Sequence, residues 1–203
     1  MGLMDESRVD GEVRRAQIVE VARRLFAEYG YRQTTTRQLA RAVGVSDALM
    51  YRHFESKDDV LRAVVDQGVT GFAAMREAAG AGRDRPLAER MTILGQAFLD
   101  VLDAQADLLV LFFSEHELLA DDARLVGFID LAASGFGEEL AARARSGEVR
   151  ADLNGYLFAR SFMGSLVSFV LLQKVLGMDR VRAVDAGEFL SELVGNYVRG
   201  ARP

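Results

Sequence analysis

The sequence predicts an all-α fold, and three observations support this prediction. Apolar side chains recur at intervals of three and four residues along most of the 203-residue chain, as they do on one face of a helix. Proline, which interrupts helices, occurs only at Pro86 and Pro203. No run of residues alternates between apolar and polar as a half-buried strand would. The chain is long enough to build a hydrophobic core, and half of its residues are apolar.

The helices can be placed in order along the chain. A first helix is expected from about Glu12 to Tyr29, with an apolar stripe through Ile18, Ala22 and Phe26. Two short helices follow within residues 34–57. The segment Gly80–Pro86 is the clearest linker. The longer helices are expected over residues 57–79, 86–104, 106–119, 122–146, 153–176 and 185–200.

The two short helices carry clear start and stop signals. Thr35 and Gln38 have the spacing of a capping box, which satisfies free backbone N–H groups at a helix start. Gly44 suits the left-handed conformation that ends a helix, and Ser46 can cap the next one. Ser56 and Asp59 offer a third start signal. Two helices joined by such a tight glycine turn indicate a helix-turn-helix, which places its second helix in a DNA major groove.

Charge is concentrated on the same segment. Residues 14–57 contain nine basic and four acidic side chains, a net charge of +5, whereas the whole chain carries −5. A cationic surface is expected where a protein meets phosphate. Chance variation in surface charge is the simpler alternative, and the motif argues against it. In the second short helix Met50 and Phe54 face inward, which leaves the polar side outward.

Residues 14–65 resemble the N-terminal domain of the TetR family of bacterial transcriptional regulators. The resemblance is carried by F-x-x-x-G-Y, T-T-x-x-x-L-A, G-V-S and Y-x-H-F-x-S-K at fixed spacing. It implies a ligand-responsive repressor that binds a palindromic double-stranded DNA operator. Leu49 departs from the small or hydroxylated residue usual in the family, and Asp47 is acidic, so the operator sequence stays open. The expected DNA-binding residues are Thr36, Arg37, Asp47, Ala48, Leu49, Tyr51, Arg52, His53 and Lys57.

A symmetric dimer is expected because one recognition helix covers only a few base pairs. The last two helices are more apolar than surface helices need to be, and the resemblance implies a homodimer interface there. The alternative is that these residues form ordinary core. The interface candidates are Phe158, Phe162, Leu166, Phe169, Phe189, Leu193 and Tyr197.

The middle helices are rich in aromatic residues and methionine. The resemblance implies a cavity here for a small-molecule effector of unknown identity, whereas the residues alone fit a packed core equally well. His116, between Glu115 and Glu117, could orient a polar group of a ligand or be a core histidine. The candidates are Met91, Leu94, Phe98, Phe112, Phe113, His116, Phe128 and Phe162.

The sequence offers no carrier for enzymatic chemistry. Cysteine is absent, and neither His53 nor His116 has the Glu-x-x-His spacing of a di-iron site. We therefore expect no catalytic residues, no metal and no cofactor. The longest apolar stretch, Ser161–Leu172, is shorter than the roughly 20 residues that span a bilayer, so we expect a cytoplasmic protein without a membrane partner. A helical carrier of apolar ligands is the rival interpretation, but it leaves the cationic turn unexplained.

These inferences predict two domains. Residues 1–56 would form a three-helix DNA-binding unit, and residues 57–203 a larger helical domain for ligand binding and dimerisation, with about nine helices in all.

Overall fold

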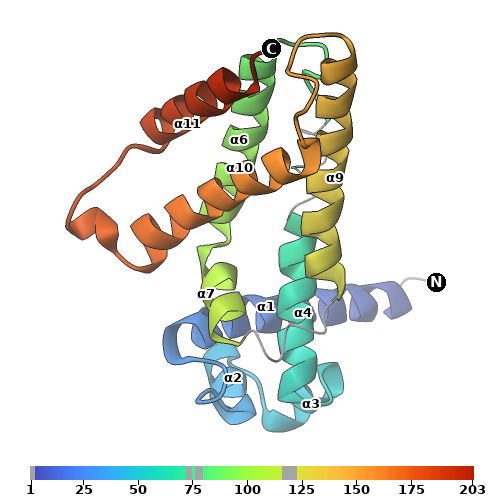
Figure 1. The fold of residues 1–203 in the computed structure, drawn as a ribbon. Coiled ribbons are helices and arrows are strands. Elements are labelled where there is room, and N and C mark those ends of the chain that lie inside the picture. The colour runs from blue at the N-terminus through green and yellow to red at the C-terminus, as the bar shows by residue number, and fades with distance from the viewer. Residues whose placement is uncertain (1–2, 72–74, 76–79, 116–122) are drawn as a thin grey trace. The chain divides into compact units, whose positions relative to one another are not determined.

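A computed structural model describes residues 3–71, 75, 80–115 and 123–203, and every regular element within them is helical (Figure 1). The all-α prediction is therefore confirmed. In chain order the elements are α1 (Leu3–Tyr29), α2 (Thr36–Val43), α3 (Asp47–His53), α4 (Lys57–Gly71), α6 (Leu87–Ala104), α7 (Ala106–Ser114), α9 (Ala123–Arg145), α10 (Gly155–Val170), η1 (Leu171–Val175), η2 (Met178–Arg180) and α11 (Ala186–Ala201).

Most boundaries follow the capping signals, and the differences have physical causes. Helix α1 begins at Leu3 rather than near Glu12, so the polar N-terminal residues are helical. The helix expected over 153–176 continues from α10 into a π-helical turn, η1. There the buried Gln173 accepts a hydrogen bond from the Val184 backbone N–H at 3.2 Å, which secures the return of the chain toward α11. The ends expected for the helices over 57–79 and 106–119 lie outside the described residues.

The chain divides into two compact units, of which the first comprises residues up to 70 together with 107–121. Its core is formed by α1, α2, α3, α4 and α7. The edge of the Phe26 ring meets the Tyr31 ring at 5.1 Å between centroids. The division expected at residue 56 concerns function and stays a prediction; by packing, α4 and α7 belong with the N-terminal helices. Fully buried members of this core are Ile18, Ala22, Phe26, Leu39, Met50, Phe54, Val60, Val64 and Leu111.

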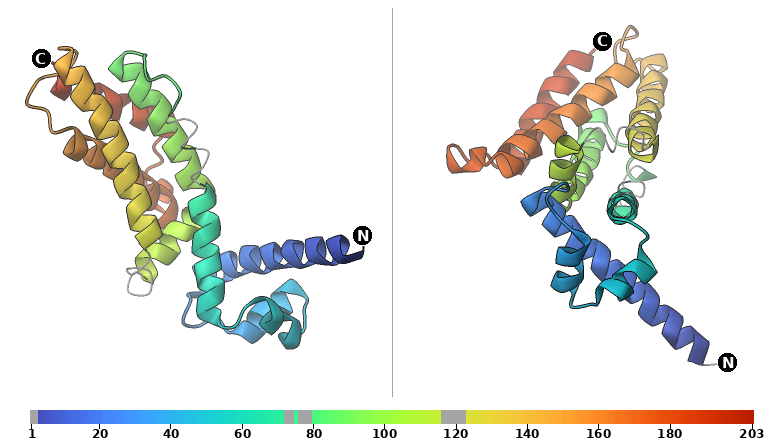
Figure 2. Two further views of the ribbon diagram at one scale, coloured as in Figure 1. Left: turned by 90° about the vertical axis from the view of Figure 1, so that its right-hand side faces the viewer. Right: turned by 90° about the horizontal axis from the view of Figure 1, so that it is seen from below.

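The second unit comprises residues 71–106 and 122–203 and contains α6, α9, α10 and α11. Glycines allow α9 and α10 to cross closely. A Cβ on Gly137 would lie 2.9 Å from the Tyr156 backbone nitrogen, and one on Gly155 would overlap the Gly137 carbonyl oxygen. Between α10 and α11 the chain makes a projecting turn that contains η1 and η2 (Figures 1 and 2). The Phe169 and Phe189 rings stack at 4.3 Å and join the two helices near this turn.

One continuous helical stretch, Gly155–Val175, is long and apolar enough to cross a membrane by length and composition. The expectation that no segment reaches this length is therefore wrong. The criterion is weak for a single helix, because core helices also meet it. In this chain 28% of the most apolar window is buried, and the exposed residues of α10 and η1 include Arg160, Ser161, Ser168 and Lys174 beside the apolar Leu157 and Leu172.

Candidate functional site

The helix-turn-helix is held by the caps that the sequence predicts. Thr35 Oγ1 accepts a hydrogen bond from the Gln38 backbone N–H at 3.2 Å, and Gln38 Oε1 accepts from the Thr35 N–H at 2.7 Å, which completes the capping box. Gly44 ends α2 with φ of 78°, in the left-handed region. Ser46 caps α3 by accepting from the Leu49 N–H at 3.2 Å. The Val45 N–H donates to the Ala40 carbonyl oxygen at 2.9 Å, and Leu39 and Met50 share one core, so the turn and this packing hold α2 and α3 together.

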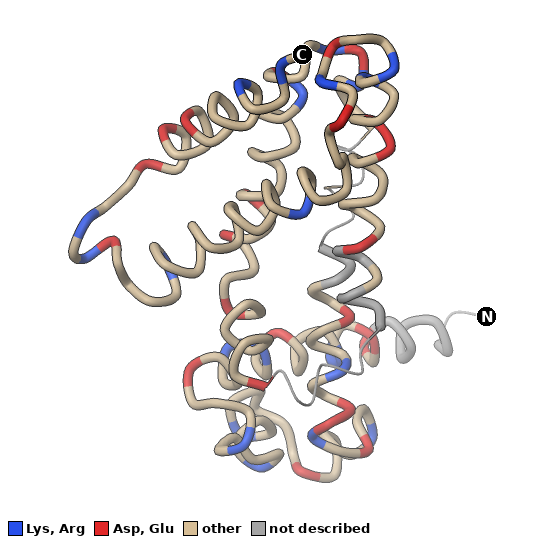
Figure 3. Tube along the Cα trace, in the orientation of Figure 1, with Lys and Arg blue, Asp and Glu red and all other residues tan. Residues whose placement is uncertain are grey.

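Helix α3 has a buried side and an open side. Met50 and Phe54 are buried in the core, as predicted. Ala48 and Arg52 are exposed, and Tyr51 has 56% of its surface accessible. Leu49 and His53 are half-buried at the margins. Within this unit, therefore, the side of α3 that would enter a groove is uncovered, and basic residues occur on both α2 and α3 (Figure 3).

Two polar pairs connect the start of α2 with α3. The Thr36 and Tyr51 hydroxyl oxygens lie 3.3 Å apart, so both are presented at the same edge of the motif. Arg37 Nε lies 3.9 Å from Asp47 Oδ2, an exposed ion pair that partly neutralises the acidic residue on this surface. The hydroxyl pair lies beside the free N–H groups of the α2 N-terminus, where an anion is stabilised by the helix dipole.

Lys57 has a structural environment that the sequence did not reveal. Its Nζ donates to the carbonyl oxygens of Tyr31 at 2.9 Å, Thr34 at 3.0 Å and Arg32 at 3.5 Å, and it lies 4.2 Å from the centroid of the Tyr31 ring. All three N–H donors thus face the loop between α1 and α2. The expected contact of Lys57 with phosphate would have to compete with these bonds.

Tyr31 completes this arrangement. Its hydroxyl donates to the Asp58 carboxylate in the first turn of α4. Burial raises the pKa of the Tyr31 phenol above its ordinary value, and the hydrogen bond to Asp58 raises that pKa further. Lys57 and Asp58 therefore tie the start of α4 to the loop that precedes α2.

The second unit contains a pocket of about 240 Å³ between α6, α9 and α10. Its wall is mainly apolar and aromatic. Three charged residues, Arg83, Arg90 and Glu139, also line it. The apolar lining consists of Met75, Leu94, Phe98, Leu131, Ala132, Phe136, Phe162, Met163 and Leu166.

The charged side of this pocket is an ion-pair network. Arg90 is 2% exposed, and its guanidinium donates from Nε and Nη2 to the Glu139 carboxylate at 3.0–3.1 Å. Arg143 donates to the same carboxylate at 3.0 Å and to Glu148 at 2.7 Å. These pairs join α6 to α9, with backbone carbonyls of residues 81–85 as further acceptors.

The comparisons with known proteins agree with the motif. Residues 18–64 match the sequence model of the bacterial regulatory proteins, tetR family. The HTH-type transcriptional repressor KstR2 of Rhodococcus jostii (strain RHA1) is 30% identical over 151 residues, which is 70% of each chain. The chain belongs to the TetR family. The expected resemblance is confirmed, and the chain has the architecture of a TetR-family regulator.

Another relative and a solved structure match over a shorter stretch or at lower identity. The regulator HbdR of Aromatoleum sp. (strain CIB) is 35% identical over 115 residues, 57% of this chain, and the aligned part spans only half of HbdR. The structure of FadR from Bacillus subtilis in complex with stearoyl-CoA has a TM-score of 0.70 at 21% identity, covering 92% of this chain and 99% of that chain. This second likeness supports the fold alone.

The ligand residues expected of a TetR-family regulator are only partly brought together. Leu94, Phe98 and Phe162 line the pocket, whereas Met91 is fully buried beside it and is not part of the lining. Phe112 instead packs against the core of the first unit, and Phe113 is 50% exposed on the same helix, α7. His116 lies outside the described residues, as does the side chain of Phe128. The two phenylalanines of α7 do not line this pocket, because that helix belongs to the other compact unit, and their contact with a ligand stays a prediction.

The dimer candidates also divide into two groups. Phe162, Leu166 and Phe169 are buried within a single chain and form its own core. Phe158 and Tyr197 are half-buried and meet edge to face at 4.9 Å, while Phe189 and Leu193 are half-buried on α11. The apolar residues left open on α10 and η1 are others: Tyr156, Leu157, Leu172 and Leu176.

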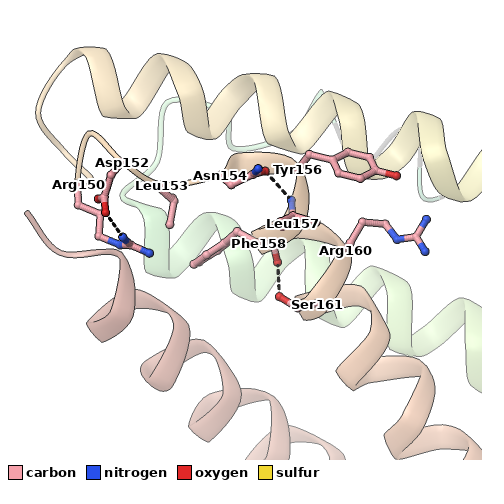
Figure 4. Close-up of a pocket in the computed structure, with 9 residues that line it drawn as sticks. All are labelled: Arg150, Asp152, Leu153, Asn154, Tyr156, Leu157, Phe158, Arg160 and Ser161. Carbon is pink, nitrogen blue, oxygen red and sulfur yellow. Dashed lines mark hydrogen bonds and ion pairs between the residues drawn. The ribbon is translucent and has the colours of Figure 1, made fainter.

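The start of α10 forms the wall of an open groove (Figure 4). Asn154 caps the helix by accepting from the Leu157 N–H at 3.0 Å, and Arg150 pairs with Asp152 at 2.7 Å. Leu157 is 60% exposed in this groove. Leu157 is not among the predicted interface residues, because apolar spacing alone does not distinguish an exposed position such as Leu157 from a buried one such as Leu166.

Proposed function

We propose that the chain is a transcriptional repressor that binds a palindromic operator as a homodimer and is released by a small, largely apolar effector. One observation carries the proposal: α3 is capped at its start and anchored by Met50 and Phe54, while its opposite side is open. In a TetR-family chain this surface fits a major groove. Such a regulator would act in the cytoplasm, where bacterial DNA lies.

We assign different roles to the exposed side chains. Thr36 and Tyr51 would bind one phosphate with their paired hydroxyls, supported by the α2 N-terminus. Arg52 would reach a base edge or a phosphate, and Ala48 would contact a thymine methyl group. The pairing of Arg37 with Asp47 keeps the acidic group from repelling the DNA backbone.

Dimerisation through α10 and α11 is supported by their uncovered apolar surface. Leu157 is 60% exposed and Leu176 is 65% exposed, with Leu172 at 38% between them. The exposed residues between Leu157 and Leu172 include Gly164 and Ser168, whose small size would let a second helix approach closely. Because a symmetric interface uses the same surface on both chains, α10 of one subunit would meet α10 of the other.

Release by an effector is supported by the pocket of the second unit. A ligand that prefers one conformation shifts the population toward it, and DNA affinity changes by the same coupling free energy. FadR of Bacillus subtilis, which has the same fold, was solved with stearoyl-CoA bound. The R. jostii relative KstR2 is described as a repressor, which favours repression over activation here.

The test uses duplex fragments of the DNA that flanks the gene. Sedimentation velocity with a labelled fragment should show a faster-sedimenting complex at low salt, with a mass that corresponds to two chains, or a multiple of two, per fragment. A mutated palindrome of the same length and composition is the control. Absence of any complex at low salt, or one chain per fragment at saturation, would reject the proposal.

A further inference from the structure

We propose that the pocket between α6, α9 and α10 selects an uncharged, compact and largely apolar ligand of about ten non-hydrogen atoms. The inference rests on the proposed function for its regulatory meaning, because it identifies the class of effector. The binding selectivity itself can be measured without DNA.

The size follows from the cavity volume. An apolar cavity of about 150 Å³ holds benzene, which has six carbon atoms. The pocket of about 240 Å³ is larger by a factor of roughly 1.6, so in proportion it holds about ten non-hydrogen atoms. The rings of Phe98, Phe136 and Phe162 line it, and such walls favour a flat or linear hydrocarbon body. A long acyl chain would exceed the volume that the described residues enclose.

The preference for an uncharged ligand follows from the ion-pair network. Arg90 and Arg143 face Glu139 and Glu148, so two cations are matched by two carboxylates. Both oxygens of Glu139 accept hydrogen bonds, Oε1 from Arg90 and Arg143 and Oε2 from Arg90. Arg90 also donates from Nη1 to the Ala81 carbonyl. Arg83, the remaining charged residue of the described lining, is exposed, unlike the buried Arg90, and has an interaction of its own.

An anionic group beside the buried Arg90 would therefore find both cations of this network already paired with carboxylates. It would have to lose its hydration and displace Glu139 from an arginine, which leaves a buried carboxylate unpaired. An uncharged ligand avoids this cost, since a hydroxyl or carbonyl group can lie against the network without replacing any pair. The network thus disfavours the binding of anions, and it also forms one end of the pocket.

The experiment compares octan-1-ol with octanoate by isothermal titration calorimetry on the full chain at neutral pH. The two probes share one hydrocarbon chain and differ in charge. We expect octan-1-ol to bind at least about tenfold more tightly, which corresponds to about 1.4 kcal/mol. Equal affinity, or tighter binding of octanoate, would overturn the proposal.

A matched pair of variants on α9 shows whether binding occurs in this pocket. Gly135 lines the pocket and Gly127 does not, and a Cβ on either would meet no atom within 4 Å. Gly135→Leu should abolish the heat of octan-1-ol binding, whereas Gly127→Leu should preserve it. If both variants bind octan-1-ol like the original chain, the site lies elsewhere and the assignment is wrong.

A third variant tests the role of charge. Glu139→Gln keeps the shape of the side chain and leaves the two arginines with one carboxylate. The affinity for octanoate relative to that for octan-1-ol should therefore rise by about tenfold or more. An unchanged ratio in a folded variant, verified by circular dichroism, would contradict the charge argument. None of these titrations contains DNA, so failure here leaves the sedimentation test of the proposed function standing, and the reverse also holds.

Discussion

Replacing Lys57 by methionine tests how the start of α4 is attached to the first unit. The change keeps much of the aliphatic length and removes the ammonium group. It deletes hydrogen bonds of 2.9 and 3.0 Å to the Tyr31 and Thr34 carbonyls and a marginal one of 3.5 Å to Arg32. It also removes the contact with the Tyr31 ring at 4.2 Å.

The magnitude follows from the number and exposure of these bonds. A hydrogen bond to a charged group contributes roughly 1.5–3 kcal/mol to stability. Lys57 is half-buried, so water can reach some of the released carbonyls, and we take the loss as about one such bond, ~2 kcal/mol. Because small proteins have urea m values of roughly 1–3 kcal/mol/M, the unfolding midpoint should fall by about 1 M.

The control is Lys174→Met, at the only other lysine of the chain. Its ion pair with Asp103 spans 3.2 Å between side chains that are 54% and 58% exposed, so its removal should cost less than about 1 kcal/mol. Urea unfolding of all three proteins at one concentration measures the difference. If Lys57→Met destabilises no more than Lys174→Met, the structural role of Lys57 is refuted. The salt dependence of DNA binding should stay unchanged, whereas a slope smaller by about 0.9 would reveal a phosphate contact.

Three further predictions follow from single contacts. Thr36→Val and Tyr51→Phe should each weaken binding to operator and random DNA alike, by about fivefold in fluorescence anisotropy. The double variant should lose less affinity than the two single effects combined, because both hydroxyls are expected to bind one phosphate. Gly137→Ala should destabilise the chain by about 1–3 kcal/mol in thermal unfolding, because its Cβ would lie 2.9 Å from the Tyr156 nitrogen, while Gly127→Ala in the same helix should be neutral or stabilising. The free energy of unfolding should fall as pH rises above about 10, because the unfolded chain releases the Tyr31 proton there while the folded chain retains it. Chemical denaturation at pH 9 and 11 measures this decline, and Tyr31→Phe should remove the part that Tyr31 causes.

The local features of the DNA-binding unit could be predicted because each depends on residues close in sequence. Thr35 and Gln38, Gly44, and Ser46 form caps whose partners lie within five residues along the chain. The inward position of Met50 and Phe54 followed from their spacing on one helix. These patterns require no knowledge of the tertiary structure.

The contacts that were missed join residues far apart in sequence. Lys57 meets carbonyls 23 to 26 residues earlier, and Arg90 meets Glu139 across 49 residues. A signal for Arg90 did exist, since it lies four residues before Leu94 and three after Leu87 on the apolar side of α6. A charge in such a stripe predicts a buried partner, but it does not identify which one.

The packing of Phe112 against the core of the first unit could not be predicted, for a related reason. Helix α7 is apolar around most of its circumference, so its spacing did not distinguish a pocket wall from the core of the first unit. The dimer candidates show the same ambiguity, because apolarity selected Leu166, which is fully buried, over Leu157, which is exposed.

The central claim, that the open side of α3 binds DNA, is tested most directly by a charge reversal at Arg52. Arg52→Glu and Arg180→Glu change the net charge of the chain by the same amount, and both side chains are exposed. Anisotropy titrations with the flanking duplex should show that Arg52→Glu loses at least about a hundredfold in affinity, while Arg180→Glu changes it by less than about threefold. Equal losses in the two variants, or full affinity in Arg52→Glu, would contradict the claim.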